Sequence, residues 1–300
     1  MSTVRIAHFS DTHVLSLEGV GPKRFLNKRW TGAVNLALNR SRHYRVEIFE
    51  RLLEAVVASE PDHSVCTGDL VNLALEPEFV RVAGLLRDAF EPSQLTLVPG
   101  NHDYYVKEAV SDRLFETSFG EFQTQAIEQE GPYPIVRLLD DVAIIGLNSA
   151  IPTPAFLATG RIGDAQLGAF DELMRNERLG DRFKMVLIHH PLLPEPNRRL
   201  DSARRLLDAG EFIDAINGLN GSKPDLIVHG HNHEFKRMSV PGSKVPIVQV
   251  ASASRSGNKH RAEFNVYVIT DGVLAAIERY IHQPDSGQFL RCDEAGQPIG

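Results

Sequence analysis

The stretch Val4-Arg5-Ile6-Ala7-His8-Phe9-Ser10-Asp11-Thr12-His13 begins as an apolar run and ends in a polar block. The run predicts a strand over residues 4–9, and Asp11-Thr12-His13 follows it almost directly. Four further polar blocks follow apolar runs in the same way: Gly68-Asp69, Gly100-Asn101-His102-Asp103, His189-His190-Pro191 and Gly230-His231-Asn232-His233. In α/β sheets, ligands bind beyond the carboxyl ends of strands, so these blocks are the candidate functional residues.

The first half of the chain alternates predicted strands with predicted helices. Apolar residues recur at helical spacing over residues 45–60, 76–90 and 105–119. Short strands are predicted at residues 63–66 and 94–98. Strand, helix and strand in this order are typical of parallel βαβ units.

The second half is predicted to be richer in strands. A hairpin is expected over residues 135–148, strands at 184–188 and 225–229, and helices at 164–175 and 204–217. Four more strands, at residues 235–240, 246–251, 264–270 and 273–280, are expected to form an antiparallel meander. Parallel units followed by antiparallel strands predict an α/β fold of two packed sheets flanked by helices.

Length and composition predict one domain and exclude several classes of protein. The chain has 300 residues, and we expect a single domain over residues 1–283, with a basic insertion at about 15–45 and a loose tail at 284–300. The net charge of -7 argues against a nucleic-acid polymer as partner. Two cysteines give no disulfide framework, and we see neither a signal peptide nor a membrane span. A cytoplasmic protein is expected.

The polar blocks offer seven candidate metal ligands and no cysteine. They are Asp11, His13, Asp69, Asn101, His189, His231 and His233, with His102 left over. Each block alone is a weak signal, but all of them at strand ends converge on one edge of a parallel sheet. Oxygen and nitrogen ligands without sulfur suit two divalent ions such as Mn, Fe, Zn or Co. Two adjacent metals indicate hydrolysis of a phosphate ester.

The ordered set of blocks over residues 4–233 resembles the calcineurin-like metallophosphoesterases. The resemblance implies a four-layer α/β/β/α sandwich with a dinuclear site and a metal-bridging hydroxide as nucleophile. It implies that Asp11, His13 and His233 hold the first metal, that Asn101, His189 and His231 hold the second, and that Asp69 bridges both. It also implies that His102 contacts the phosphate and protonates the leaving oxygen. Asp103 would orient His102 by accepting its other N–H.

The block His189-His190-Pro191-Leu192 and the chain length resemble the branch with class III cyclic-nucleotide phosphodiesterases and glycerophosphodiesterases. The resemblance implies a phosphodiesterase acting on a small phosphate ester. A phosphomonoesterase, or a pyrophosphate hydrolase acting on a nucleotide or lipid conjugate, is the alternative. A non-catalytic scaffold is disfavoured because no ligand position is substituted. The oligomeric state stays open.

One segment departs from the acidic character of the chain. Residues 22–45 contain seven basic residues and no acidic one, interleaved with apolar side chains. We expect either a plain amphipathic surface segment, a lid over the site, or a surface that contacts anionic lipid. As a lid, it would bring Arg24, Arg29 and Arg42 to the substrate. The polar segment 252–261 is expected to line the same rim or merely to connect two strands.

Overall fold

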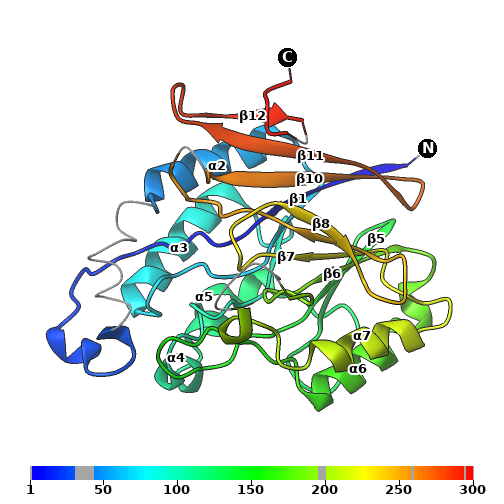
Figure 1. The fold of residues 1–300 in the computed structure, drawn as a ribbon, viewed down its shortest axis with the longest axis horizontal. Helices are drawn as coiled ribbons and strands as arrows, with labels where there is room; N and C mark the ends of the chain where they lie inside the picture. Colours follow the sequence, from blue (N-terminus) through cyan, green and yellow to red (C-terminus); the bar gives the residue numbers. More distant parts are fainter. Residues whose placement is uncertain (1, 31–43, 195–200, 258–259, 294, 300) are drawn as a thin grey trace.

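The computed structural model describes residues 2–30, 44–194, 201–257, 260–293 and 295–299, and Arg42 lies outside these ranges. Two six-stranded sheets pack face to face, with helices on the outer face of each (Figure 1). The predicted four-layer α/β/β/α sandwich is confirmed.

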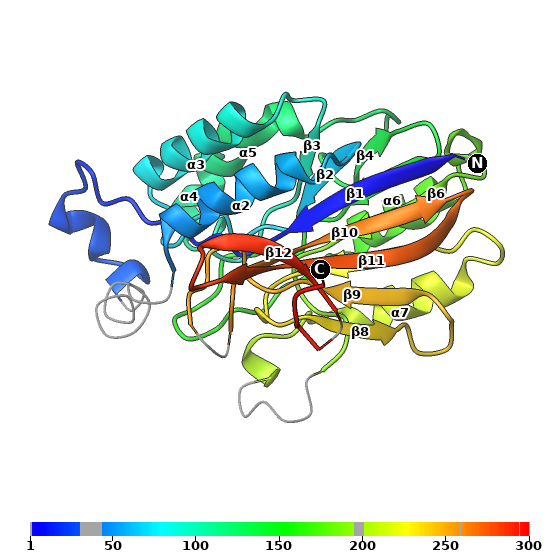
Figure 2. The same cartoon turned by 90° about the horizontal axis from the view of Figure 1, so that it is seen from above.

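The first sheet has the strand order β12-β11-β10-β1-β2-β3. Its strands are β1 (Thr3–Phe9), β2 (His63–Cys66), β3 (Leu95–Leu97), β10 (Glu263–Thr270), β11 (Val273–Gln283) and β12 (Gln288–Cys292). β1, β2 and β3 are parallel, whereas β10 pairs antiparallel with β1 and begins an antiparallel ladder through β11 and β12. Figure 2 shows β10 between β1 and β11, so the last third of the chain lies beside its first strand.

The second sheet has the strand order β4-β5-β6-β7-β9-β8. Its strands are β4 (Ile135–Leu138), β5 (Val142–Gly146), β6 (Phe183–Leu187), β7 (Leu226–His229), β8 (Lys236–Ser239) and β9 (Pro246–Gln249). β5, β6, β7 and β9 are parallel, and the two edge strands are antiparallel to their neighbours. The hairpin predicted over residues 135–148 is the pair β4 and β5.

The helices form the outer layers because each buries one apolar face. Helices α2 (Val46–Ala58), α3 (Glu76–Ala89), α4 (Lys107–Ser111) and α5 (Leu114–Phe119) accompany the first sheet, and α6 (Asp164–Met174) and α7 (Ala209–Gly218) cover the second. Short 3-10 helices span Pro22–Phe25, Gly120–Phe122, Glu177–Leu179 and Asp201–Ala203. Separate buried clusters lie under each helical layer, and a third cluster fills the space between the sheets.

Some expectations for the secondary structure are wrong. The four late strands do not form one meander, because β8 and β9 join the second sheet and β10 and β11 join the first. The tail is not loose throughout, since β12 pairs with β11. The helix expected over residues 105–119 breaks at Arg113, whose φ of 52° is left-handed. The helix expected from residue 204 begins only at Ala209.

Candidate metal centre

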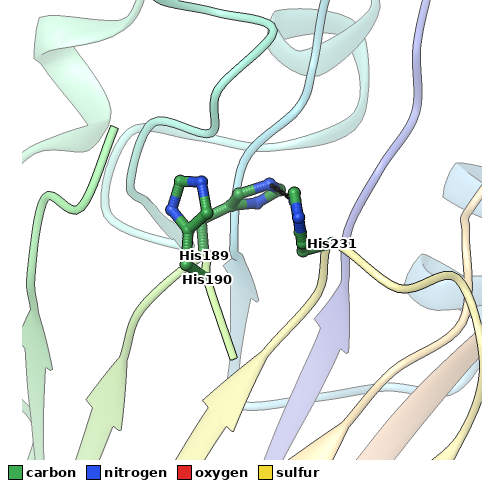
Figure 3. Close-up of side chains that lie close together, drawn as sticks. All are labelled: His189, His190 and His231. Atoms are coloured by element: carbon green, nitrogen blue, oxygen red, sulfur yellow. Dashed lines mark hydrogen bonds between the residues drawn. The ribbon is translucent and has the colours of Figure 1, made fainter. Parts of the chain in front are cut away.

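The polar blocks meet at one edge of the sandwich because the strands before them run in parallel. β1, β2 and β3 end at this edge from the first sheet, and β6 and β7 end there from the second. All seven candidate ligands and His102 are buried. Figure 3 shows His189 and His190 following one strand and His231 following its neighbour, with the three rings grouped beyond the strand ends.

One group of ligand atoms comes from Asp11, His13 and His233. The Nε2 atom of His233 lies 2.9 Å from Asp11 Oδ1 and 3.1 Å from Nε2 of His13. The other oxygen of Asp11, Oδ2, accepts the backbone N–H of His231 at 2.9 Å. Three lone-pair atoms therefore face the same small volume, which is the arrangement that a divalent cation requires.

A second group comes from Asn101, His189 and His231. The Nε2 atom of His189 lies 3.2 Å from Oδ1 of Asn101 and 3.1 Å from Nδ1 of His231. The Nδ1 atom of His189 faces the backbone carbonyl of Thr67 at 2.6 Å. A carbonyl oxygen only accepts, so His189 carries its proton on Nδ1 and presents Nε2 as a bare nitrogen.

The carboxylate of Asp69 lies between the two groups. Its Oδ2 is 3.9 Å from Nε2 of His13, and its Oδ1 is 3.4 Å from Nε2 of His189. Oδ1 also accepts the backbone N–H of His102 at 2.7 Å. One carboxylate thus faces both nitrogen clusters with different oxygens, as a bridging ligand would.

The donor set fits divalent metal ions. Four groups of titratable side chains, drawn from the residues above, His102 and His190, have ligand atoms close enough to share a cation. Burial raises the pKa of Asp69, but His189, His102 and His13 more than offset this and hold the pKa well below its ordinary value. Nitrogens and ionised carboxylates packed at such distances need positive charge among them, which protons on the imidazoles or bound cations supply. Oxygen and nitrogen donors without thiolate suit Mn, Fe, Zn or Co.

The loops that present these ligands are backbone-strained. The five residues Asp11, His13, Asp69, His231 and His233 all have left-handed φ angles, between 46° and 72°. Residues other than glycine adopt this conformation uncommonly, and such outliers cluster at functional sites. The sharp turns aim side chains from the strand ends at a common point.

Two glycines leave room for the carboxylates. A Cβ atom at Gly100 would overlap Oδ1 of Asp69, and one at Gly230 would overlap Oδ2 of Asp11. Glycine at these two positions therefore allows the backbone to approach the site closely.

His102 lies beside the first group. Its ring meets the ring of His13 edge-on, with centroids 4.7 Å apart, and stacks on the ring of Tyr105 at 5.2 Å. Its Nδ1 donates to the carbonyl oxygen of Asn72 at 2.6 Å. This contact fixes the ring and leaves Nε2 as the atom that can face a substrate.

The expectation that Asp103 orients the ring of His102 is wrong. The Asp103 carboxylate accepts backbone N–H groups of Asp69, Leu70, Val71 and Gly100 at 2.8–3.1 Å. Burial and the charge of Asp69 raise the pKa of Asp103, whereas these donated hydrogen bonds favour its ionised form. Asp103 therefore shapes the loop that carries Asp69 and joins it to the loop of Gly100.

The choice of His189 over His190 agrees with the geometry. His190 lies next to both His189 and His231, with ring centroids at 5.0 and 4.8 Å (Figure 3). Its Nδ1 is 2.8 Å from Oγ of Ser149, and burial lowers its pKa well below the ordinary value. His189 is the member of the pair whose Nε2 faces both Asp69 and Asn101.

The basic segment is tied to the domain in ways its sequence did not reveal. Arg29 is buried, and its guanidinium donates to the carbonyl oxygens of Leu73 at 2.8 Å and Ala74 at 2.5 Å. The prediction that Arg29 contacts substrate is wrong, because these carbonyls hold its side chain inside the protein. Arg24 pairs with Glu76 at the surface.

Lys28 is one cation of this segment that lies near the candidate site. Its Nζ is 4.5 Å from the centre of the Tyr105 ring, which stacks on His102. It also donates to Oγ1 of Thr153 at 2.8 Å. Burial lowers its pKa to about 8, and the charge of Asp69 opposes that shift.

Several residues that support the site were missed in the sequence. The Tyr44 hydroxyl lies 3.0 Å from Nδ1 of His233. Ser252 and Ser254 donate from their hydroxyls to the carbonyls of Asp11 at 2.7 Å and Thr12 at 2.6 Å. At its start, the polar segment expected over residues 252–261 therefore contacts the first block through Ser252 and Ser254. Backbone contacts of this kind leave no side-chain pattern to recognise.

The chain belongs to the calcineurin-like phosphoesterase family, whose model matches residues 4–235. Membership identifies it as a phosphoric ester hydrolase that uses divalent metal ions. A search of curated proteins found no match.

Solved structures share the fold at low sequence identity. TT1561 of Thermus thermophilus is 14% identical with a TM-score of 0.52, over 93% of this chain and 98% of that one. Purple acid phosphatase PPD1 from yellow lupin seeds is 11% identical with a TM-score of 0.56, over 97% of this chain and 53% of that one. These likenesses establish the architecture. Among the described residues, the helices are all too short or too polar to cross a membrane.

Proposed function

We propose that this protein is a phosphodiesterase that works with two divalent metal ions at the edge where β1, β2, β3, β6 and β7 end. The observation that carries the proposal is the position of Asp69, whose two carboxylate oxygens face two different nitrogen clusters. A site for one metal ion would not need the second cluster of ligand nitrogens.

The roles follow from the two groups of atoms. Asp11, His13 and His233 would hold one ion, and Asn101, His189 and His231 the other. Asp69 would bridge them. When bound, the two ions supply Lewis acidity and a water that ionises near neutral pH. The identity of the ions among Mn, Fe, Zn and Co is open to elemental analysis.

The chain's own groups orient the substrate and manage a proton. Asn72 holds the His102 ring so that Nε2 is available, and a protonated His102 can donate from Nε2 to the leaving oxygen. Lys28 lies behind Tyr105 and adds positive charge on the same side. Two divalent ions and two carboxylates leave a net charge of about +2, which suits a phosphate anion.

The preference for a diester rests on the resemblance carried by the block His189-His190-Pro191-Leu192, because the charge of the centre permits a diester without requiring one. A diester carries one negative charge and needs no further cation beyond this centre, whereas a monoester or a pyrophosphate would fit the same core. The test measures hydrolysis of bis-p-nitrophenyl phosphate and p-nitrophenyl phosphate by protein loaded with each metal. Faster hydrolysis of the diester is expected. Turnover of the monoester alone would replace the proposal with a phosphomonoesterase, and no turnover by metal-loaded protein would favour a scaffold.

A substrate at a lipid surface is a second candidate, and the exposure of two apolar side chains favours it. Leu26 is 85% exposed and Trp30 is 55% exposed, next to the basic residues of the segment. Amphipathic basic segments bind anionic membranes in this way. Sedimentation with phosphatidylserine vesicles tests the idea. Binding that Leu26→Ser with Trp30→Ser abolishes is expected, and equal binding to neutral vesicles would refute it.

A further inference from the structure

A cavity of about 610 Å³ opens beside the first group of metal-ligand atoms. His13, Tyr44 and Asn72 form its wall on the side of the centre. His13 is a candidate ligand, Tyr44 contacts His233, and the carbonyl of Asn72 holds His102. A molecule bound at the centre can therefore extend directly into this cavity. Its volume is typical of small-molecule pockets.

The charged side chains that line the cavity are mostly basic. Arg45, Arg51 and Arg81 line it, and Glu47 is the acidic residue among the described residues that do so. Within the described part of the chain, none of the three arginines forms an ion pair, unlike Arg24 and Arg87, which pair with Glu76 and Glu121. An overall acidic protein thus places an excess of positive charge in a cavity next to the proposed metal centre.

The arginines come from two neighbouring helices and the residue that precedes one of them. Arg45 precedes helix α2 and Arg51 lies within it, whereas Arg81 is on α3. Arg51 is held by a hydrogen bond of 3.2 Å to the carbonyl of Gly287, in the turn between β11 and β12. The amino end of α2 adds partial positive charge to the same wall. The fold therefore gathers donors that suit a planar or tetrahedral oxyanion.

We propose that this cavity binds a second anionic group, a phosphate carried on the leaving group of the substrate. The inference rests on the proposed function and narrows its substrate class to small esters that carry a second phosphate, separated from the scissile one by a short organic spacer. A diester of this kind would place its scissile phosphorus at the centre and its terminal phosphate among Arg45, Arg51 and Arg81.

Competition between ligands that differ only in the second phosphate tests the proposal. The probes are α,ω-alkanediol bisphosphates of increasing chain length and the matching alkyl monophosphates, assayed as inhibitors of bis-p-nitrophenyl phosphate hydrolysis. We expect the best bisphosphate to bind about tenfold more tightly than its monophosphate, as one or two charge-assisted contacts provide. In Arg45→Ser with Arg81→Ser, the ratio of the two inhibition constants should fall towards one.

The matched control is Arg178→Ser, an exposed arginine in the 3-10 helix Glu177–Leu179, away from the cavity. It should keep both hydrolysis and the bisphosphate preference. Equal inhibition by bisphosphates and monophosphates in the original protein, or a preference unchanged in the double variant, would overturn the inference. Melting temperatures of all variants exclude misfolding as the cause.

Calorimetric titration of metal-loaded protein with the same probes separates this inference from the proposed function. A preference for the bisphosphate in a protein that hydrolyses nothing would support the cavity and overturn the phosphodiesterase. Hydrolysis of the diester without any preference for the bisphosphate would support the phosphodiesterase and overturn the role of the cavity.

Discussion

The Nδ1 atom of His102 lies 2.6 Å from the backbone carbonyl oxygen of Asn72, so a main-chain group, not a carboxylate, fixes this imidazole. The acceptor cannot be removed by substituting a side chain, and it favours the tautomer of His102 that carries its proton on Nδ1. Nε2 is therefore the atom through which His102 acts. We expect His102→Ala to retain its metals and to lose turnover by about 10²- to 10⁴-fold, as general-acid roles are typically worth.

Elemental analysis beside steady-state kinetics checks that prediction. Asp103→Asn serves as the contrast. The carboxylate of Asp103 accepts hydrogen bonds from four backbone N–H groups, so its loss should lower stability as well as activity. Unchanged turnover in His102→Ala would remove the residue from the mechanism.

Asp69→Asn should weaken both metal sites, because each carboxylate oxygen faces a different cluster. Asp11→Asn should weaken chiefly the site of His13 and His233, which its Oδ1 faces. Metal content after dialysis against a weak chelator distinguishes the two variants. Loss of one ion from each would show that Asp69 does not bridge.

Gly100→Ala should disrupt metal binding, since a Cβ atom there would overlap Oδ1 of Asp69. Gly84→Ala, within helix α3, has open space around its new Cβ and should leave the metals in place. Alanine is the better helix former, so this control should gain roughly 0.5–1 kcal/mol of stability. Metal titration and thermal melts measure both effects. Full metal occupancy in Gly100→Ala would show that the loop can shift.

Arg29→Met should lower stability, with KM changing little in the protein that remains folded. It would leave the buried carbonyls of Leu73 and Ala74 without their donor, and each unsatisfied group is worth about 1–3 kcal/mol. Arg24→Ser removes a surface ion pair with Glu76 and should change stability by less than about 1 kcal/mol. Urea unfolding compares the two. A raised KM in Arg29→Met at unchanged stability would restore the role in substrate binding.

Stability should fall in mild acid because His63 is buried as a neutral base. Burial, followed by the charge of Arg137, lowers its pKa from 6.5 to about 3. The unfolded chain takes up a proton below pH 6.5 and the folded one does not, so this stability is lost progressively as pH falls from 6.5 towards 3. His63→Gln, which can still bond Oγ1 of Thr96, should flatten that slope in denaturant titrations at several pH values. An unchanged slope would assign the effect to other groups.

The sequence predicted that the polar blocks meet at one edge of the sandwich. The blocks that contain Asp11, Asp69, His189 and His231 follow parallel strands, and the common direction of those strands fixes where the blocks meet. Glycines in the blocks, such as Gly100 and Gly230, also indicate where the backbone passes close to the site.

The sequence was less informative where backbone groups or sheet order decide the structure. Arg29 looks like a surface charge until the carbonyls of Leu73 and Ala74 are known. Strands β8 and β10 have alternating patterns that fit either sheet, and only tertiary packing assigns them to different ones. The contact between Asn72 and His102 uses a carbonyl that every residue has.

Strand β1 is synthesised before its neighbour β10, and most of the described chain lies between them. A nascent chain must keep one edge of β1 unpaired until Glu263–Thr270 has emerged. The carbonyl of Asp11 likewise lacks its donor until Ser252 has emerged. Products of premature termination near residue 235 would retain every candidate ligand and still lack half of the first sheet. During translation, the chain therefore contains every candidate ligand before it contains all the strands that support the site.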